Sequence, residues 1–372
     1  MTKILLIASF AESLINFRGA LILALQSRGL QVHVAAPNMP TKSTIRIKLE
    51  AAGVIVHEVS MQRTGTNPVA DFLTLVHLWI LMRRIRPKYM LGYTIKPVIY
   101  GSMAAWAAGV PRRFALITGL GYTLQNVRRW GILKIIIQRL YAISLSFVHT
   151  VFFHNSDDES SFRQCALLDF EGRTCVINGS GVDVDFFKVV PLPLGRPCFL
   201  LMSRLLGDKG VREYAEAARR IRIKYPDVRC VLAGWIDTNP DAIAQEELDI
   251  WIADGVLEFL GRLDDVRPAI ASCSVYVLPS YHEGTPRSVL EAMSMGRAII
   301  TSDAPGCRET VLHRKNGLLV NPKSINELEQ AMLEFINDEG LAARMGAQSR
   351  HIAQVKYDVH KVNAAMMDEM KI

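Results

Sequence analysis

The chain alternates short β-rich runs with longer apolar segments of helical spacing, and this alternation occurs twice along its 372 residues. In the first half the expected strands are residues 3–9, 31–36, 54–59, 89–92, 114–118 and 150–153. The helices expected between them are residues 17–28, 44–52, 69–85, 99–108 and 129–148. Strands that alternate with helices predict a mostly parallel sheet covered by helices on both faces.

The pattern restarts after residues 188–197, which hold three prolines and one glycine and are typical of a linker. Strands are expected at 198–203, 229–233, 257–260, 275–278, 298–301 and 317–320, with a helix at 211–224 and a helical tail from residue 325. We predict an N-terminal domain over 1–187, a linker over 188–197, a C-terminal domain over 198–355 and a terminal helix over 356–372. The expected α/β architecture is two Rossmann-like, doubly wound domains facing a cleft, with ligands at the carboxyl ends of the strands.

The charge is unevenly distributed along the chain. Residues 1–150 contain 18 Lys and Arg but only 4 Asp and Glu, a net charge of +14. The whole chain carries +7, so residues 151–372 carry about −7. A basic half predicts an anionic partner, such as nucleic acid, a membrane surface or a lipid diphosphate. Because no RNA-binding signature or helix-turn-helix pattern stands out, we do not expect a nucleic-acid partner.

The cysteines and histidines give no sign of a metal centre. None of the six cysteines forms a C-x-x-C pair, and the nine histidines lack metal-ligand spacing. We therefore predict no metal and no cofactor, and the scattered thiols favour a reducing, cytoplasmic compartment. The apolar run 4–10 fits a first strand better than a signal peptide, and no stretch reaches the ~18 uncharged residues of a spanning helix.

Two glutamates, Glu283 and Glu291, flank a Gly/Pro turn and the start of a helix expected at 288–295. The turn follows the β-rich run 274–280, so the unit is a strand, a tight loop and a helix N-terminus. Such a terminus offers backbone N–H groups and a positive dipole end to an anion such as a diphosphate. The carboxylates can accept hydrogen bonds from sugar hydroxyls. On spacing alone, an ordinary loop with two solvated glutamates has about equal weight.

Arg204 and Lys209 lie in a polar loop with two glycines, directly after the expected strand 198–203. The Arg fork can bind two oxygens of a diphosphate, and Lys acts as a point charge. Two surface cations are the alternative. Gly234, Arg262 and Glu283 each follow another expected strand, which favours one shared sheet edge.

Two motifs carry a family resemblance: S-R-L-x-x-x-K-G at 203–210 and P-S-x-x-E-G-x-P-x-x-x-L-E-A at 279–292. Together they resemble the donor domain of retaining glycosyltransferases of family 4, which have the two-domain GT-B fold. Residues 177–187 resemble the crossover of that family into its second domain, and Gly306 and the run 316–320 also fit. The resemblance covers most of 177–322.

The resemblance implies a site for a UDP-sugar donor. Arg204 and Lys209 would bind its diphosphate, Glu291 its ribose and Glu283 the transferred sugar. It implies further donor contacts at Gly234, Arg262, Gly284, Thr285, Pro286 and Arg287. Glu283, Arg204 and Lys209 would then be catalytic, and no metal would be needed because the two cations neutralise the leaving diphosphate.

The first half resembles a narrower group, through residues 93–97, 109–113 and 118–122. These look like bacterial transferases that extend sugars on polyprenyl diphosphate, a group that includes an N-acetylgalactosaminyltransferase activity of protein N-glycosylation. The implied reaction moves a hexose or N-acetylhexosamine to a polyprenyl-diphosphate-linked saccharide. Acceptor contacts would come from Lys96, Thr118, Gly119 and Gly121.

Two features depart from the family pattern. Many members carry a histidine on the loop after the strand equivalent to 114–118, whereas this chain has Thr118-Gly119-Leu120-Gly121 there. No histidine is therefore assigned a catalytic role. The usual glycine-rich loop after the first strand is replaced by residues 9–13. Glu12 or Thr118 could contact the reacting groups, although a plain loop residue is the more frequent role.

Residues 126–148 interleave basic and apolar side chains, with Arg128, Arg129, Trp130 and Lys134 among isoleucines and leucines. A basic, Trp-bearing, apolar helix can lie in the interface of an anionic membrane. A helix packed on the sheet is the alternative for part of the segment. We predict contact with an anionic membrane surface here, and a peripheral location on the inner face of the cell membrane.

Two other functions compete with glycosyl transfer. A nucleotide-sugar 2-epimerase shares the GT-B architecture, but it needs no basic membrane face. A non-catalytic sugar-nucleotide-binding protein is the third hypothesis. The joint presence of Glu283, Glu291, Arg204 and Lys209 favours a working donor site.

Overall fold

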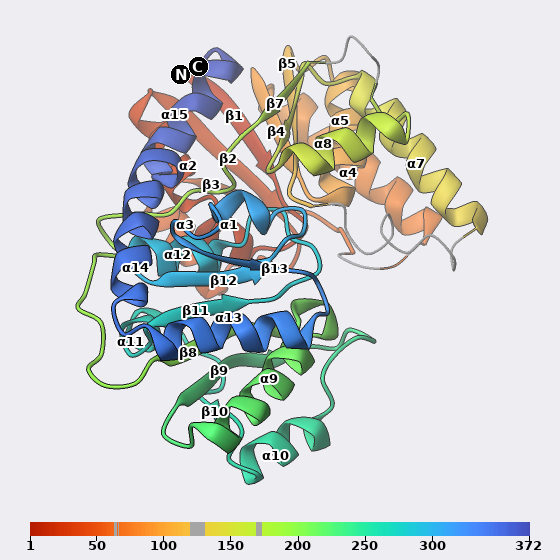
Figure 1. Ribbon diagram of the computed structural model, residues 1–372. Coiled ribbons are helices and arrows are strands. Elements are labelled where there is room, and N and C mark those ends of the chain that lie inside the picture. The colour runs from red at the N-terminus through yellow and green to blue at the C-terminus, as the bar shows by residue number, and fades with distance from the viewer. Residues whose placement is uncertain (63–64, 66, 120–130, 169–172) are drawn as a thin grey trace. The chain divides into compact units, whose positions relative to one another are not determined.

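A computed structural model describes the chain except for residues 63–64, 66, 120–130 and 169–172 (Figure 1). The chain forms two compact units. The first contains Met1–Ser180 and His360–Ile372, and the second contains Gly181–Val359. The end of the chain, from His360, therefore belongs to the first unit.

The first unit is built on a seven-stranded sheet in the order β3-β2-β1-β4-β5-β6-β7, and neighbouring strands pair in parallel. Its strands are β1 (Thr2–Ile7), β2 (Leu30–Ala36), β3 (Ile55–Glu58), β4 (Tyr89–Tyr93), β5 (Arg112–Ile117), β6 (Thr150–Phe153) and β7 (Thr174–Val176). The described helices are α1 (Glu12–Asn16), α2 (Gly19–Ser27), α3 (Thr44–Ala51), α4 (Pro68–Ile85), α5 (Ile95–Ala107), α7 (Gly131–Ser146), α8 (Ser156–Gln164) and α15 (Val359–Met370).

Alternation along the strands divides the core of this unit between the two sheet faces. Leu6 of β1 packs in one cluster with residues of α1, α2, α3 and α15. Its neighbours Leu5 and Ile7 point to the other face, where they pack with residues of α4 and α5. Further along that face, α5, α7 and α8 cover β5 and β6 (Figure 1). Helices thus cover both faces of a parallel sheet.

The second unit repeats this architecture with six parallel strands in the order β10-β9-β8-β11-β12-β13. The strands are β8 (Cys198–Leu205), β9 (Arg229–Ile236), β10 (Glu258–Phe259), β11 (Val275–Leu278), β12 (Ala298–Ser302) and β13 (Gly317–Val320). The helices are α9 (Val211–Lys224), α10 (Gln245–Ala253), α11 (Arg267–Ala271), α12 (Arg287–Ser294), α13 (Ile325–Asn337) and α14 (Leu341–Ile352), and a π-helical segment follows at Ala353–Tyr357.

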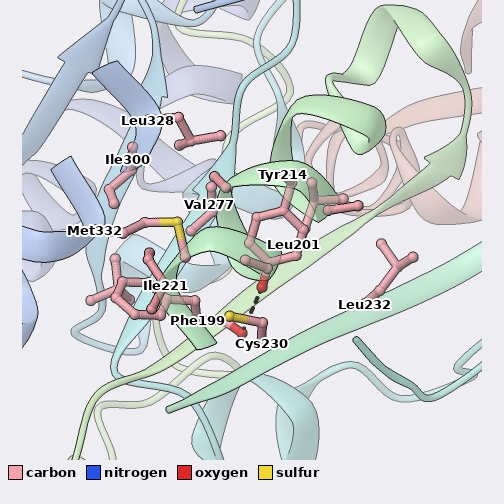
Figure 2. Packing of buried hydrophobic residues seen from close by; sticks show 14 of the residues in the cluster. Phe199, Leu201, Tyr214, Ile221, Cys230, Leu232, Val277, Ile300, Leu328 and Met332 are labelled. Atoms are coloured by element: carbon pink, nitrogen blue, oxygen red, sulfur yellow. Dashed lines mark hydrogen bonds between the residues drawn. The ribbon is translucent and has the colours of Figure 1, made fainter. Parts of the chain in front are cut away.

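The larger core of this unit surrounds Tyr214 of α9 (Figure 2). Phe199 and Leu201 of β8 point to the same face and pack with residues of α9 and α13. The Tyr214 hydroxyl is fully buried and donates to the carbonyl oxygens of Phe199, at 3.0 Å, and Val231, at 3.2 Å. A buried polar group with partners costs little stability, so Tyr214 fits an otherwise apolar core.

The predicted α/β architecture of two doubly wound domains is confirmed, with local corrections. The helix expected from residue 99 begins at Ile95. Pro97 is tolerated in its first turn, because the N–H that proline lacks would have no helical partner there. The strand expected to end at residue 203 continues to Leu205, so Arg204 lies in a strand and not in a loop. Helix α8 and strand β7 were not predicted, although Asn155 and the acidic residues after it are a helix-start signal for α8.

Arg297 stabilises the second unit through buried hydrogen bonds. Its side chain is fully buried, and its guanidinium donates to five backbone carbonyl oxygens, those of Val190, Pro191, Ile270, Ala271 and Met295. These carbonyls belong to the proline-rich segment 188–197, to α11 and to the end of α12. One cation therefore ties the segment predicted as a linker to α11 and to the end of α12.

We expect Arg297→Met to lower the free energy of unfolding by about 3 kcal/mol, because it leaves buried carbonyl groups without a donor. Urea unfolding followed by tryptophan fluorescence measures this. Arg344→Met is the matched control, since the Arg344 side chain is 62% exposed. Equal unfolding midpoints for the two variants would show that Arg297 does not brace the unit.

Candidate active site

The strand order of the second unit reverses between β8 and β11. In open parallel sheets, ligands bind outside the carboxyl ends of the strands at such a point. Here the loop after β8 meets the loop after β11. The backbone N–H of Tyr281 donates to the Asp208 carbonyl at 2.8 Å, and the Ser280 hydroxyl donates to the same oxygen at 3.1 Å.

Two glycines allow close approach to the loop after β11: Gly210 in the loop after β8, and Gly306 in the loop after β12. Gly210 has a φ of 72°, and a Cβ at this position would lie 2.3 Å from the Pro279 carbonyl oxygen. Gly306 has a φ of 78°, and its Cβ would lie 2.0 Å from the Glu283 carbonyl oxygen. Any side chain at either position would force the loops apart, so both glycines are needed to form the site.

Lys209 and Glu283 form an ion pair at the meeting point, with 2.7 Å between Nζ and Oε1. Their side chains are only 13% and 19% exposed. Burial lowers the pKa of Lys209, but the charge and hydrogen bond of Glu283 raise it by more, so the net pKa lies above its ordinary value. The lysine is thus held charged in a poorly solvated position, which strengthens its attraction for a second anion.

Arg204 forms a second ion pair, with Asp237. Arg204 lies opposite Trp235 in the register of β8 and β9, so the residue two positions after Trp235 falls on the same side. The guanidinium Nη1 is 2.7 Å from the Asp237 carboxylate, and this hydrogen bond lowers the pKa of Asp237. The sequence analysis missed Asp237. The signal that could have found it was the parallel pairing of the expected strands 198–203 and 229–233, which places Asp237 near Arg204.

Glu291 lies in α12, where Arg287 pairs with it one turn earlier at 2.9 Å. Its side chain is 12% exposed. Burial raises the pKa of Glu291 above its ordinary value, and the contact with Arg287 lowers it by less. Gly284, Thr285 and Pro286 lead into this helix, so they lie beside its N-terminal N–H groups, as predicted.

Gly234 lies inside β9, two residues before its end and not after the strand as expected, and Arg262 follows β10 by three residues. Gly234 has a φ of 151°, and its N–H donates to the Gly261 carbonyl at 2.9 Å. The Arg262 guanidinium lies 4.9 Å from the centre of the Trp235 ring, and this indole is 42% exposed. A partly exposed indole with a cation beside it is a suitable surface for a flat aromatic ligand.

The sheet of the first unit reverses in the same way between β1 and β4. The hydroxyls of Ser9 and Thr94, which follow these strands, lie 2.7 Å apart. Lys96 lies in the first turn of α5, and its Nζ is 2.6 Å from Asp71. The Tyr100 hydroxyl donates to the other oxygen of Asp71 at 2.9 Å. Lys96 is therefore at the predicted edge, but Asp71 already engages it.

The remaining predicted acceptor and membrane residues are only partly described. Thr118 and Gly119 follow β5, and both are partly buried. Gly121, Arg128, Arg129 and Trp130 lie outside the described residues. Lys134 lies in α7, but its side chain is not described. Glu12 begins α1.

Among the described residues, no group of three or more His, Cys, Asp and Glu side chains is placed to hold a metal ion. The six cysteines are free thiols, and four of them are buried. No helix in the described part of the chain is long and apolar enough to cross a membrane.

Two family models match the chain, one for each unit. The model described as Glycosyl transferase 4-like matches residues 3–155, and the one described as Glycosyl transferases group 1 matches residues 196–338. The chain belongs to these glycosyltransferases. The family resemblance drawn from the two motifs is confirmed.

Curated relatives share most of the length of the chain. An N,N'-diacetylbacillosaminyl-diphospho-undecaprenol alpha-1,3-N-acetylgalactosaminyltransferase of Campylobacter jejuni is 29% identical, over 93% of this chain and 92% of the relative. A UDP-Gal:alpha-D-GlcNAc-diphosphoundecaprenol alpha-1,3-galactosyltransferase of Escherichia coli is 25% identical, over 73% of this chain and 72% of the relative.

Solved structures confirm the GT-B fold of this glycosyltransferase. Sucrose-phosphate synthase from Thermosynechococcus elongatus matches with a TM-score of 0.83 at 18% identity, over 100% of this chain and 98% of that one. Anabaena HepE in complex with UDP matches with a TM-score of 0.79 at 18% identity, over 100% of both chains.

We expect the stability that Glu291 contributes to depend on pH. Because the folded state raises its pKa, it holds the proton more tightly than the unfolded chain does. This contribution is present below the ordinary value of 4.5 and is lost as the pH rises through the folded-state pKa. Glu291→Gln should therefore gain stability relative to the wild type between pH 4.5 and neutral pH.

Urea unfolding of both proteins at the two pH values measures this difference. Glu246→Gln, at an exposed position, is the control for loss of a charge. A difference between Glu291→Gln and the wild type that stays constant or falls with pH would contradict the burial argument.

Proposed function

We propose that this glycosyltransferase moves a hexose or N-acetylhexosamine from a UDP-sugar to a saccharide carried on polyprenyl diphosphate. The observation that carries the proposal is the pair of buried or half-buried cations, Lys209 and Arg204, at the strand reversal of the second unit. Each pairs with one carboxylate and keeps further N–H donors, which can bind oxygens of a diphosphate. The two relatives named above act on sugars linked to diphosphoundecaprenol.

The donor binds in the second unit, and its diphosphate, transferred sugar, ribose and uracil each contact different residues. The diphosphate lies against Lys209, Arg204 and the N-terminal N–H groups of α12, which attract anions. Glu283 accepts hydrogen bonds from hydroxyls of the transferred sugar, and Glu291 does so from the ribose. The uracil ring lies near Gly234 and Arg262. Anabaena HepE, which shares the fold and was crystallised in complex with UDP, supports UDP as the nucleotide part of the donor.

The chemical step breaks the bond between the anomeric carbon and the phosphate oxygen and forms a bond to the acceptor oxygen. Lys209 and Arg204 stabilise the charge that develops on the leaving diphosphate, in place of a metal ion. The acceptor hydroxyl attacks on the face that the diphosphate leaves, and a phosphate oxygen takes its proton. This course retains the anomeric configuration of the donor.

The acceptor binds at the carboxyl edge of the first unit, where we assign contacts to Lys96, Thr118, Gly119 and Gly121. Its lipid chain stays in the membrane, so the enzyme works as a peripheral protein on the cytoplasmic membrane face. The net charge of +14 over residues 1–150 supports an anionic surface as the partner.

UDP release from a panel of UDP-sugars, with and without a bacterial polyprenyl-diphosphate saccharide extract, tests the proposal. We expect release with one donor only when the lipid is present. Lys209→Ala should lower this rate about 100-fold or more, because it removes a charge that stabilises the transition state. Lys315→Ala, at an exposed loop position, is the matched control and should keep the wild-type rate.

The same assay separates the finer points and the competing functions. Undiminished transfer in the presence of EDTA, and a product with the donor's anomeric configuration, would support the metal-independent, retaining course. Release that requires no acceptor and yields a 2-epimer would replace transfer with epimerisation. UDP binding with no turnover on any donor or acceptor would leave a binding protein.

A further inference from the structure

Helix α4 presents apolar side chains on the side away from the core. Leu78, Leu81 and Met82 are buried against the sheet and α5. On the opposite side Val69, Phe72, Leu73, Trp79 and Ile80 are 68%, 64%, 57%, 40% and 53% exposed. We call these five residues, together with Arg83 and Arg84, the α4 outer face.

The spacing of these residues makes one continuous surface. Positions 69, 72, 73, 80, 83 and 84 are linked by steps of three, four or seven residues, and Trp79 lies seven after Phe72, so all seven residues share one side of the helix. A single exposed apolar residue such as Ile223, which is 79% exposed on α9, is ordinary for a protein surface. Five on one helix are a contiguous apolar patch, which marks an interaction site.

The charges around the patch point to a negatively charged partner. Arg83 and Arg84 end the α4 outer face, and the exposed Arg86 and Lys88 follow directly. The one acidic residue of α4, Asp71, is buried and paired with Lys96. A second copy of this chain would bring the same positive charges to the contact, which disfavours self-association.

An anionic membrane surface fits both properties. Its interface accepts the apolar face of a helix, tryptophan prefers the boundary between headgroups and acyl chains, and anionic headgroups attract arginine and lysine. The 18 residues of α4 give an apolar and basic strip about 27 Å long.

We propose that the α4 outer face is the surface by which this enzyme docks on an anionic membrane. The proposal rests on the proposed function, because a lipid-linked acceptor requires the enzyme at a membrane. It assigns docking to a helix other than the segment 126–148 that the sequence suggested. Helix α7, which includes the exposed Ile135 and Ile136, packs on the other side of α5 and belongs to the same layer.

The position of α4 also relates docking to the acceptor edge. The Lys96–Asp71 ion pair joins the first turn of α5 to the first turn of α4 at the carboxyl edge of the sheet. Val69 and Phe72 lie in that same first part of α4. A membrane against the α4 outer face therefore reaches the edge assigned to the acceptor diphosphate.

Co-sedimentation with vesicles of equal parts phosphatidylcholine and phosphatidylglycerol tests the surface. We expect the double variant Phe72→Glu/Ile80→Glu to bind these vesicles about tenfold more weakly or worse, because two inserted side chains become anionic. Ile223→Glu is the matched control on the second unit and should bind as the wild type does. Both variants change exposed positions, and a thermal melt verifies that each is folded.

A second variant tests the charge separately. Arg83→Gln/Arg84→Gln should weaken binding to the anionic vesicles by about fivefold for each arginine. Arg344→Gln, at a side chain that is 62% exposed on the second unit, is the matched control. Wild-type vesicle binding by both the Phe72→Glu/Ile80→Glu and the Arg83→Gln/Arg84→Gln proteins would overturn the proposal.

An acceptor saccharide on a short-chain, water-soluble polyprenyl diphosphate distinguishes failure of docking from failure of the proposed function. With docking at α4, Phe72→Glu/Ile80→Glu loses transfer to vesicle-embedded acceptor but keeps transfer to the soluble one. If the wild type transfers to neither acceptor, the proposed function fails, whatever the vesicle result. A dimer in lipid-free solution that Phe72→Glu/Ile80→Glu abolishes would assign the surface to a second copy and overturn membrane docking.

Discussion

The ion pair between Lys209 and Glu283 is the contact around which the second unit arranges its functional residues. It joins the loops that leave two neighbouring strands, β8 and β11, at the point where the strand order reverses. The two loops approach closely because Gly210 has no side chain, and Gly306 lets the loop after β12 approach Glu283 in the same way. The result is a lysine that stays charged although it is buried, which is the property that a diphosphate site needs.

The two units share a topology but differ in chemistry at the equivalent edge. In the second unit the strand reversal holds two cation–carboxylate pairs, Lys209 with Glu283 and Arg204 with Asp237. In the first unit the same place holds the hydroxyls of Ser9 and Thr94. The same sheet topology thus carries different side chains at the equivalent edge, because the loops and not the strands supply them.

The sequence predicted the doubly wound architecture because buried parallel strands are short apolar runs between helices, a pattern that tertiary contacts rarely disguise. It also predicted that Arg204, Lys209, Glu283 and Glu291 lie at one sheet edge. It missed Asp237, because its contact with Arg204 depends on the register of two strands, which a single sequence does not display. It missed the α4 outer face because periodicity shows an apolar helix but not which side the sheet covers.

The most direct test of this account is a calorimetric titration of UDP into the wild type and into Glu283→Gln. If Lys209 is the diphosphate ligand and Glu283 serves the sugar, the variant loses transfer but binds UDP as tightly as the wild type or more tightly, because the lysine no longer shares its charge with a carboxylate. Loss of UDP affinity together with loss of transfer would show that the ion pair is only a structural brace, and would contradict the account.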